Sequence, residues 1–133
     1  MADRSRYVTD THSLLWYLYT PERLGDGAKK AFNEVAEDQA DLIVPVIVIA
    51  EIIYISKAGK VDADIKEVLS RLQSSLNITI SPLTLDRALE LDNISEVPEM
   101  HDRMIAAEAK LQSAILITRD HEISNSGVVS TIW

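Results

Sequence analysis

The chain has 133 residues, and its 21 Asp and Glu against 13 Lys and Arg give a formal net charge of −8. This length suits one domain, so we expect residues 1–133 to form a single domain. The 47% share of apolar residues argues against disorder, and the absence of Cys excludes disulfides and Cys-ligated zinc. The negative charge argues against a nucleic-acid partner if the acids are spread evenly over the surface, because Lys and Arg bind phosphate backbones.

The start of the chain, residues 1–6, is polar and lacks the apolar core of a signal peptide. The most apolar stretch covers residues 42–55. It is too short to span a membrane, and it contains Glu51. We therefore expect a cytoplasmic protein with no membrane contact.

The first half of the chain is predicted to form two strands and three helices. In chain order they are a strand over residues 7–9, helices over 11–19 and 26–35, a strand over 42–44 and a helix over 45–57. Pro21 ends the first helix, and we expect Asp26 to cap the second. Pro45 suits the first turn of the third helix. By periodicity the apolar run after Pro45 could also be a strand, but its length favours a helix.

The second half is predicted to form three helices and three strands. In chain order they are a helix over residues 62–72, a strand over 78–80, helices over 84–91 and 101–111, and strands over 114–117 and 128–131. We expect Asp62 or Asp64 to cap the first of these helices and Thr84 the second. Short strands that alternate with helices predict an α/β fold with a parallel sheet covered on both faces. Ligands of such sheets bind beyond the carboxyl ends of the strands.

Four acidic residues are in unusual positions. Asp10 and Asp120 follow predicted strands, Glu51 interrupts an apolar run, and Asp102 begins a predicted helix. Each has an ordinary explanation when taken alone: a helix cap for Asp10 and Asp102, a turn for Asp120, and an exposed stripe for Glu51. Their common location is more informative, because the predicted topology brings Asp10, Asp120 and Glu51 to the same end of the sheet.

Carboxylates gathered at one edge of a sheet repel one another unless a cation lies between them. Mg²⁺ and Mn²⁺ prefer oxygen ligands and activate water for attack on phosphates. The chain has no nucleophile elbow, Walker A sequence or dinucleotide fingerprint. His12, His101 and His121 each lie within two residues of a suspect Asp. They could contact substrate or metal, or be ordinary polar residues.

Four segments together resemble the motifs of PIN-domain ribonucleases. Residues 10–16, Asp-Thr-His-Ser-Leu-Leu-Trp, are similar to the opening motif of the VapC-like toxins of toxin–antitoxin pairs. Residues 44–51, 101–107 and 116–120 resemble the second, third and fourth motifs. The final residues, 129–133, are also typical of this subgroup, so the resemblance covers about residues 7–133. Pro45 and Val48 depart from the family pattern, because many relatives have Ser there.

This resemblance implies a PIN-like three-layer α/β/α sandwich, with a central, mainly parallel sheet of roughly four or five short strands. It also implies an endoribonuclease that hydrolyses RNA phosphodiester bonds with water activated by Mg²⁺ or Mn²⁺. The implied catalytic and metal-binding residues are Asp10, Glu51, Asp102 and Asp120. The implied partners are a cognate VapB-like antitoxin and a second copy of the chain in a homodimer.

Three neighbours of the acids are further candidates. By the resemblance, Thr118 is the hydroxyl residue that supports the site. Arg103 and Arg119 adjoin Asp102 and Asp120, and either could contact RNA phosphates or balance the acids. Glu122 could contribute to the metal site or have no role.

Two other function classes remain open. One is a PIN fold that binds RNA or protein without cleaving it, and the other is a different Mg²⁺-dependent phosphoryl-transfer domain, such as a receiver or phosphatase.

The inference from the net charge also changes if the four acids bind metal. Two divalent ions on the four acids would reduce the formal charge from −8 to −4, so the total no longer excludes RNA. The acidic stretches 34–41 and 90–99 could repel RNA or meet a basic antitoxin segment.

Overall fold

The fold is built on a sheet of five parallel strands in the order β3-β2-β1-β4-β5. A computed structural model describes residues 4–133. The strands are β1 (Ser5–Thr9), β2 (Ala40–Pro45), β3 (Ile78–Ser81), β4 (Ile115–Ile117) and β5 (Thr131–Ile132). The central strand β1 pairs with β2 on one side and β4 on the other. The prediction that residues 1–6 lack the apolar core of a signal peptide falls partly outside the described residues.

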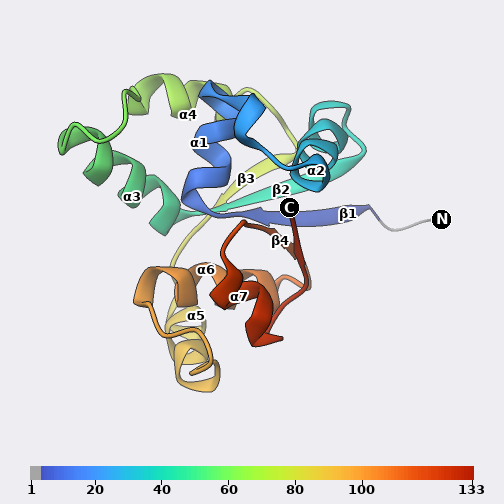
Figure 1. Ribbon diagram of the computed structural model, residues 1–133, viewed down its shortest axis with the longest axis vertical. Coiled ribbons are helices and arrows are strands. Elements are labelled where there is room, and N and C mark those ends of the chain that lie inside the picture. Colours follow the sequence, from blue (N-terminus) through green and yellow to red (C-terminus); the bar gives the residue numbers. More distant parts are fainter. Residues whose placement is uncertain (1–3) are drawn as a thin grey trace.

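Helices cover both faces of this sheet (Figure 1). They are α1 (Thr11–Tyr19), α2 (Asp26–Ala36), α3 (Val46–Lys57), α4 (Ile65–Gln73), α5 (Leu85–Glu90), α6 (Met100–Leu111) and α7 (His121–Ser126), with the short 3₁₀ helices η1 (Pro21–Arg23) and η2 (Leu91–Asn93). Figure 1 shows α1–α4 on one side of the sheet and α5–α7 on the other. The predicted three-layer α/β/α architecture with a parallel sheet is therefore confirmed.

The core lies on both faces of the central strands. Val8 of β1, Leu42 and Val44 of β2, and Leu116 of β4 are completely buried. Strands buried on both faces have continuous apolar sequences, and this explains why the segments were recognisable without an alternating pattern. None of the helices in residues 4–133 combines the length and apolar character of a membrane span.

Several predicted boundaries were wrong. Gly25, not Asp26, is the N-cap of α2, and Asp26 is the first helical residue. Pro45 ends β2 and is the N-cap of α3, so it lies just outside the first turn. Glu99 caps α6, three residues before Asp102. Such errors are expected, because several residues near a helix start can serve as the cap and only the path of the chain selects one.

The region after Asp120 was also predicted incorrectly. No helix was expected there, but α7 occupies residues 121–126 and Gly127 ends it in a left-handed conformation at φ 73°. The final strand was expected over residues 128–131 and instead begins at Thr131. A single turn of helix and a two-residue strand have too little periodicity to be recognised, because packing more than local propensity determines them.

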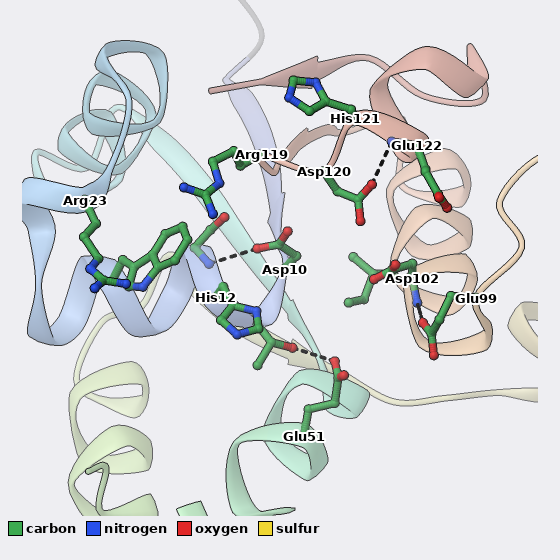
Figure 2. A pocket seen from close by; sticks show the side chains of 14 residues that line it. Asp10, His12, Arg23, Glu51, Glu99, Asp102, Arg119, Asp120, His121 and Glu122 are labelled. Carbon is green, nitrogen blue, oxygen red and sulfur yellow. Dashed lines mark hydrogen bonds between the residues drawn. The ribbon is translucent and has the colours of Figure 1, made fainter. Parts of the chain in front are cut away.

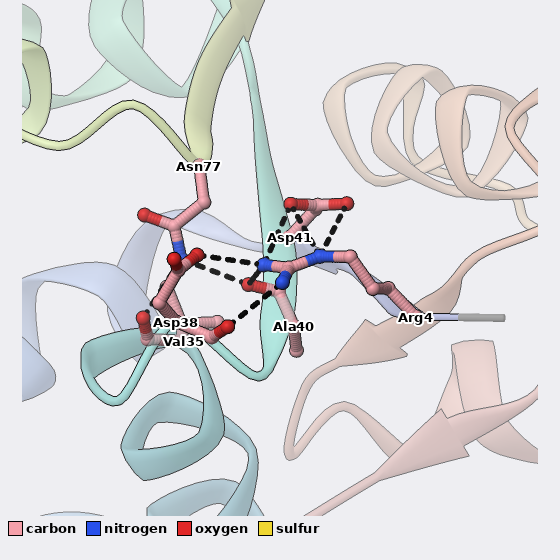
Figure 3. A network of polar contacts seen from close by, with 6 residues as sticks. All are labelled: Arg4, Val35, Asp38, Ala40, Asp41 and Asn77. Atoms are coloured by element: carbon pink, nitrogen blue, oxygen red, sulfur yellow. Dashed lines mark hydrogen bonds and ion pairs between the residues drawn. The ribbon is translucent and has the colours of Figure 1, made fainter. Parts of the chain in front are cut away.

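The segment before β1 is attached to the turn between α2 and β2 (Figure 3). The Arg4 guanidinium donates to the carboxylates of Asp38 and Asp41, at 2.9 and 3.1 Å, and to the carbonyl oxygen of Ala40. The Asn77 amide donates to the carbonyl oxygens of Val35 and Ala40. Part of the acidic stretch 34–41 is thus neutralised within the chain, which leaves less of it available for an antitoxin.

The last residue, Trp133, packs against the turn between η1 and α2. The Gly27 amide donates to the Trp133 carbonyl oxygen at 3.2 Å. A Cβ atom at Gly25 or Gly27 would lie 2.7 Å from Trp133 atoms, so no side chain fits at either position without displacement. This close approach ties the edge of the sheet to the segment that follows α1.

Candidate active site

A cavity of about 920 Å³ opens where the carboxyl ends of the strands meet the first turns of the helices. All four acids predicted from the sequence line it: Asp10, Glu51, Asp102 and Asp120. They come from four different segments, namely the β1–α1 junction, α3, α6 and the segment between β4 and α7. Figure 2 shows their side chains around the same space, with Glu99 and Glu122 at its margin. The topology therefore places Asp10, Glu51 and Asp120 together, as the parallel sheet predicted, and α6 adds Asp102.

Asp10 is held by contacts to both of its carboxylate oxygens. Its Oδ1 accepts a hydrogen bond from the Ser13 amide at 2.9 Å and so caps α1. Its Oδ2 accepts from the Thr118 hydroxyl at 2.5 Å. Thr118 is almost completely buried, and its Oγ1 also accepts from the Asp120 amide at 3.0 Å. The Thr118 hydroxyl thus links Asp10 to Asp120.

Asp120 caps α7 through one of its oxygens. Oδ1 accepts from the amides of Glu122 and Ile123, at 2.8 and 3.2 Å. Among residues 4–133, Oδ2 has no hydrogen-bond donor, so it is available to a ligand. The capping role and a ligand-binding role are compatible, because each uses a different oxygen of the same carboxylate.

Glu51 lies within α3 and accepts a hydrogen bond from a residue of α1. The Thr11 hydroxyl donates to Glu51 Oε1 at 2.6 Å, and the carboxylate is half-buried at the edge of the cavity. This contact excludes the alternative that Glu51 is a fully solvated residue on an exposed stripe. The buried Val48 lies one turn before it on the same helix and offers no hydrogen bond.

Asp102 has the most perturbed protonation in the site. Burial, together with the charges of Asp120, Glu99, Asp10 and Glu51, raises the pKa of its carboxyl to about 7. Its own amide donates to Glu99 Oε2 at 2.7 Å. The direction of the shift is that expected for a partly buried carboxyl that faces other acids across the cavity.

His101 and Glu99 form a pair beside Asp102. His101 Nδ1 lies 2.7 Å from Glu99 Oε1, and this hydrogen bond raises the pKa of the imidazole. Burial opposes ionisation of Glu99, but the hydrogen bonds from Asp102 and His101 outweigh it and lower its pKa. His12 and His121 line the cavity directly, whereas His101 does not.

The donor set of the cavity fits a hard, hydrated cation. Its acidic ligands are carboxylate oxygens, which Mg²⁺ and Mn²⁺ prefer. Within residues 4–133, no three His, Asp or Glu side chains are close enough to hold an ion directly. Mg²⁺ usually binds one or two carboxylates and keeps several waters. The side chains therefore suit an ion bound partly through water, rather than a closed cage of carboxylates.

Arg103 lies away from the cavity lining. Its Nε donates to the Val97 carbonyl oxygen at 2.5 Å, and a terminal nitrogen donates to the Leu91 carbonyl oxygen at 3.3 Å. These contacts hold the loop that precedes α6. Arg103 is therefore bound to backbone carbonyl oxygens, and it pairs with none of the acids that line the cavity.

Three residues with a charged or aromatic side chain were not expected in the cavity. Trp16 was considered only as part of the motif 10–16, Arg23 was not considered, and Glu99 was assigned to the acidic stretch 90–99, yet all three line the cavity. Glu99 had a usable signal, because an acid three residues before Asp102 at a helix start is typical of a cap. Arg23 had none, because η1 brings it there only through the packing of the turn after α1.

Comparisons with known proteins give the family. The PIN domain model matches residues 7–128. The fold is similar to that of VapBC2 from Rickettsia felis bound to a promoter DNA fragment, with a TM-score of 0.71, 14% identity, and coverage of 95% of this chain and 96% of that chain. A toxin–antitoxin complex from Klebsiella pneumoniae has a TM-score of 0.65, 20% identity, and coverage of 94% and 96%.

A third similar structure is FitAcB from Neisseria gonorrhoeae, with a TM-score of 0.64, 21% identity, and coverage of 94% of this chain and 95% of that chain. No curated protein sequence matches the chain. At these identities the structures show a shared fold. The family match covers most of the chain and replaces the alternative of a receiver or phosphatase domain. The chain belongs to the PIN domain family.

Proposed function

We propose that the protein is a Mg²⁺- or Mn²⁺-dependent endoribonuclease, the toxin of a VapBC-type pair, and that residues 1–133 act as one domain. The observation that carries this proposal is the convergence of four carboxylates on one cavity. Burial and the repulsion from the other acids raise the pKa of Asp102 to about 7. A divalent ion would relieve this repulsion and bring a phosphate to the same place.

The four acids and their neighbours would have different roles in the reaction. Asp10, Glu51, Asp102 and Asp120 would hold the ion, partly through its bound waters, and Thr118 would fix Asp10 in place. When bound, Mg²⁺ or Mn²⁺ supplies an activated water and neutralises the charge that develops on the phosphate. The helix start at Asp120 and the Thr11 hydroxyl would orient two of the carboxylates before substrate arrives.

The proposal is tested by incubating purified protein with single-stranded RNA in Mg²⁺, in Mn²⁺ and in excess EDTA. We expect cleavage with either ion and none in EDTA. Asp10→Asn is expected to abolish cleavage while the protein stays folded, because Asn is also a good N-cap. Full activity in EDTA or in Asp10→Asn would contradict the proposal.

A PIN-fold module that binds RNA or protein without cleaving it is the second candidate. The observation that favours it is the absence, in the described part of the chain, of three acidic or His ligands close enough to hold an ion directly. Calorimetric titration with Mn²⁺ separates the two candidates. Metal binding together with RNA cleavage supports the nuclease, whereas RNA binding with neither supports the module.

We propose a VapB-like antitoxin as the partner, with the toxin a homodimer in the cytoplasm. Support comes from the similarity in fold to VapBC and to other toxin–antitoxin complexes. Co-expression with the product of the adjacent upstream gene tests this. We expect a stable complex that co-purifies and does not cleave RNA, and light scattering of the protein alone should give the mass of two chains.

Thr118→Val is expected to lower RNA cleavage by about 10–100-fold, because a partner that orients a metal ligand has effects of this size. The same change leaves the Asp120 amide without its buried acceptor, at a cost of about 1–3 kcal/mol in the free energy of unfolding. Thr118→Ser keeps the hydroxyl and should retain most activity. Thr79→Val, on an exposed position of β3, is the matched control. Equal cleavage rates for Thr118→Val and Thr79→Val would contradict the assigned role.

A further inference from the structure

One side of the cavity carries cations in place of acids. Arg23 of η1 and Arg119 of the segment between β4 and α7 line it, together with Trp16 of α1. Figure 2 shows the two arginines on one flank, with the acids Asp102 and Glu99 on the opposite side. The cavity is therefore polarised, with a positive flank beside an acidic centre.

The guanidinium groups of Arg23 and Arg119 both lie over the indole ring of Trp16. The Arg119 Cζ atom lies 4.9 Å from the centroid of the ring, and that of Arg23 lies 5.8 Å from it. Both distances are within the range of cation–π attraction. The ring itself is fixed by an edge-on contact with Trp133 at 5.7 Å and by His12 at 5.8 Å. Two charges from distant segments are thus fixed on one platform.

These two arginines differ from the other five in the chain, each of which has a hydrogen-bond acceptor. Within residues 4–133, neither the Arg23 nor the Arg119 guanidinium has a hydrogen bond or an ion pair, although acids line the same cavity. The engaged arginines are Arg4, Arg6, Arg71, Arg87 and Arg103. Both free side chains are exposed, so their N–H donors are available to a ligand in the cavity.

We propose that Arg23 and Arg119, held on Trp16, form a phosphate-binding subsite for the RNA strand next to the scissile bond. The identity of the ligand rests on the proposed function. The planar guanidinium forks match phosphate oxygens, and their position in the same cavity as the acids places a neighbouring phosphate of the same strand within reach. The positive flank also offsets the repulsion between RNA and a chain of net charge −8.

The test is binding of a fluorescein-labelled oligouridylate in Mg²⁺, measured by anisotropy at several salt concentrations. Asp10→Asn is used as the parent so that the RNA stays intact. We expect Arg23→Gln and Arg119→Gln each to weaken binding. Each should also reduce the slope of log Kd against log salt by about 0.7, the value for one phosphate contact to a single strand. The double variant should lose about 1.4.

Two controls separate the subsite from general charge or folding effects. Lys60→Gln removes one charge from an exposed loop residue outside the cavity lining and should leave Kd and slope unchanged. The double change of Arg23 and Arg119 to Lys keeps the charges and should restore most of the slope, but with weaker binding, because Lys lacks the planar fork. A double Gln variant that folds and has the Kd and slope of the Lys60→Gln control would overturn the subsite.

Cleavage by the protein with Asp10 intact distinguishes failure of the subsite from failure of the proposed function. If that protein cleaves RNA and the Arg substitutions do not change KM, the subsite is wrong and the nuclease stands. If it does not cleave RNA in either ion but the salt slopes fall as expected, the nuclease is wrong and the subsite stands as part of an RNA-binding module.

Discussion

Asp102→Asn is expected to raise the melting temperature of the metal-free protein and to reduce RNA cleavage by at least about a hundredfold. Both effects follow from the position of Asp102 among the other acids. Burial and four neighbouring acids disfavour the ionised carboxylate, so a neutral residue of the same shape stabilises the empty site. The same change removes a proposed metal ligand. An ordinary surface Asp would show neither effect.

The stabilisation should depend on pH in a defined direction. The pKa of Asp102 is raised in the folded protein, so its stability contribution is fully present below the unfolded value of about 4 and is lost as pH rises to about 7. Asp102→Asn should therefore raise the melting temperature more at about pH 8 than at about pH 5. Thermal denaturation in EDTA measures this, with the exposed Asp62→Asn as control. If Asp102→Asn melted at a lower temperature than the unmodified chain at about pH 8, the assigned environment of Asp102 would be contradicted.

Mn²⁺ affinity is expected to fall about tenfold for each pH unit below about 7, because the Asp102 carboxyl must lose its proton before it can bind the ion. The pKa of His101 is also raised, and its positive charge at low pH opposes metal binding in the same direction. Calorimetric titrations at about pH 6 and about pH 8, in buffers of different ionisation enthalpy, give the affinity and the number of protons released.

Asp102→Asn provides the control for this measurement. The variant should bind Mn²⁺ more weakly at about pH 8 and should release fewer protons on binding than the unmodified chain, since it has no carboxyl at that position to ionise. Equal affinity at the two pH values in the unmodified chain would mean that Asp102 does not take part in metal binding.

The acidic part of the site could be predicted because it follows from topology. Thr9 and Ile117 are paired in adjacent parallel strands, so Asp10, the next residue after β1, and Asp120, three residues after β4, emerge at the same edge. Glu51 lies near the same edge, because it belongs to α3, which follows β2 directly. A charge in an apolar run or just after a buried strand is visible in a sequence, and it has few structural explanations.

The positive flank of the cavity and the contacts of Arg103 could not be predicted from sequence. Arg23 comes from a 3₁₀ turn, and its contact with Trp16 depends on how Trp133 packs against the turn that follows. Arg103 adjoins an acid in the sequence, but its side chain bonds to carbonyl oxygens of the preceding loop. Adjacency in sequence does not give the direction of a helical side chain relative to a loop that has no recognisable pattern.

The chemistry of the RNA ends tests the central claim most directly, because water activated by a metal and attack by the RNA 2′-hydroxyl leave different products. Single-stranded RNA is incubated with the protein in Mn²⁺ or in excess EDTA, and the new ends are identified by enzymatic labelling and sequencing. We predict 5′-phosphate and 3′-hydroxyl ends in Mn²⁺, with no new ends in EDTA or with Asp10→Asn. Cyclic phosphate ends that form equally in EDTA would contradict a metal-dependent nuclease built on Asp10, Glu51, Asp102 and Asp120.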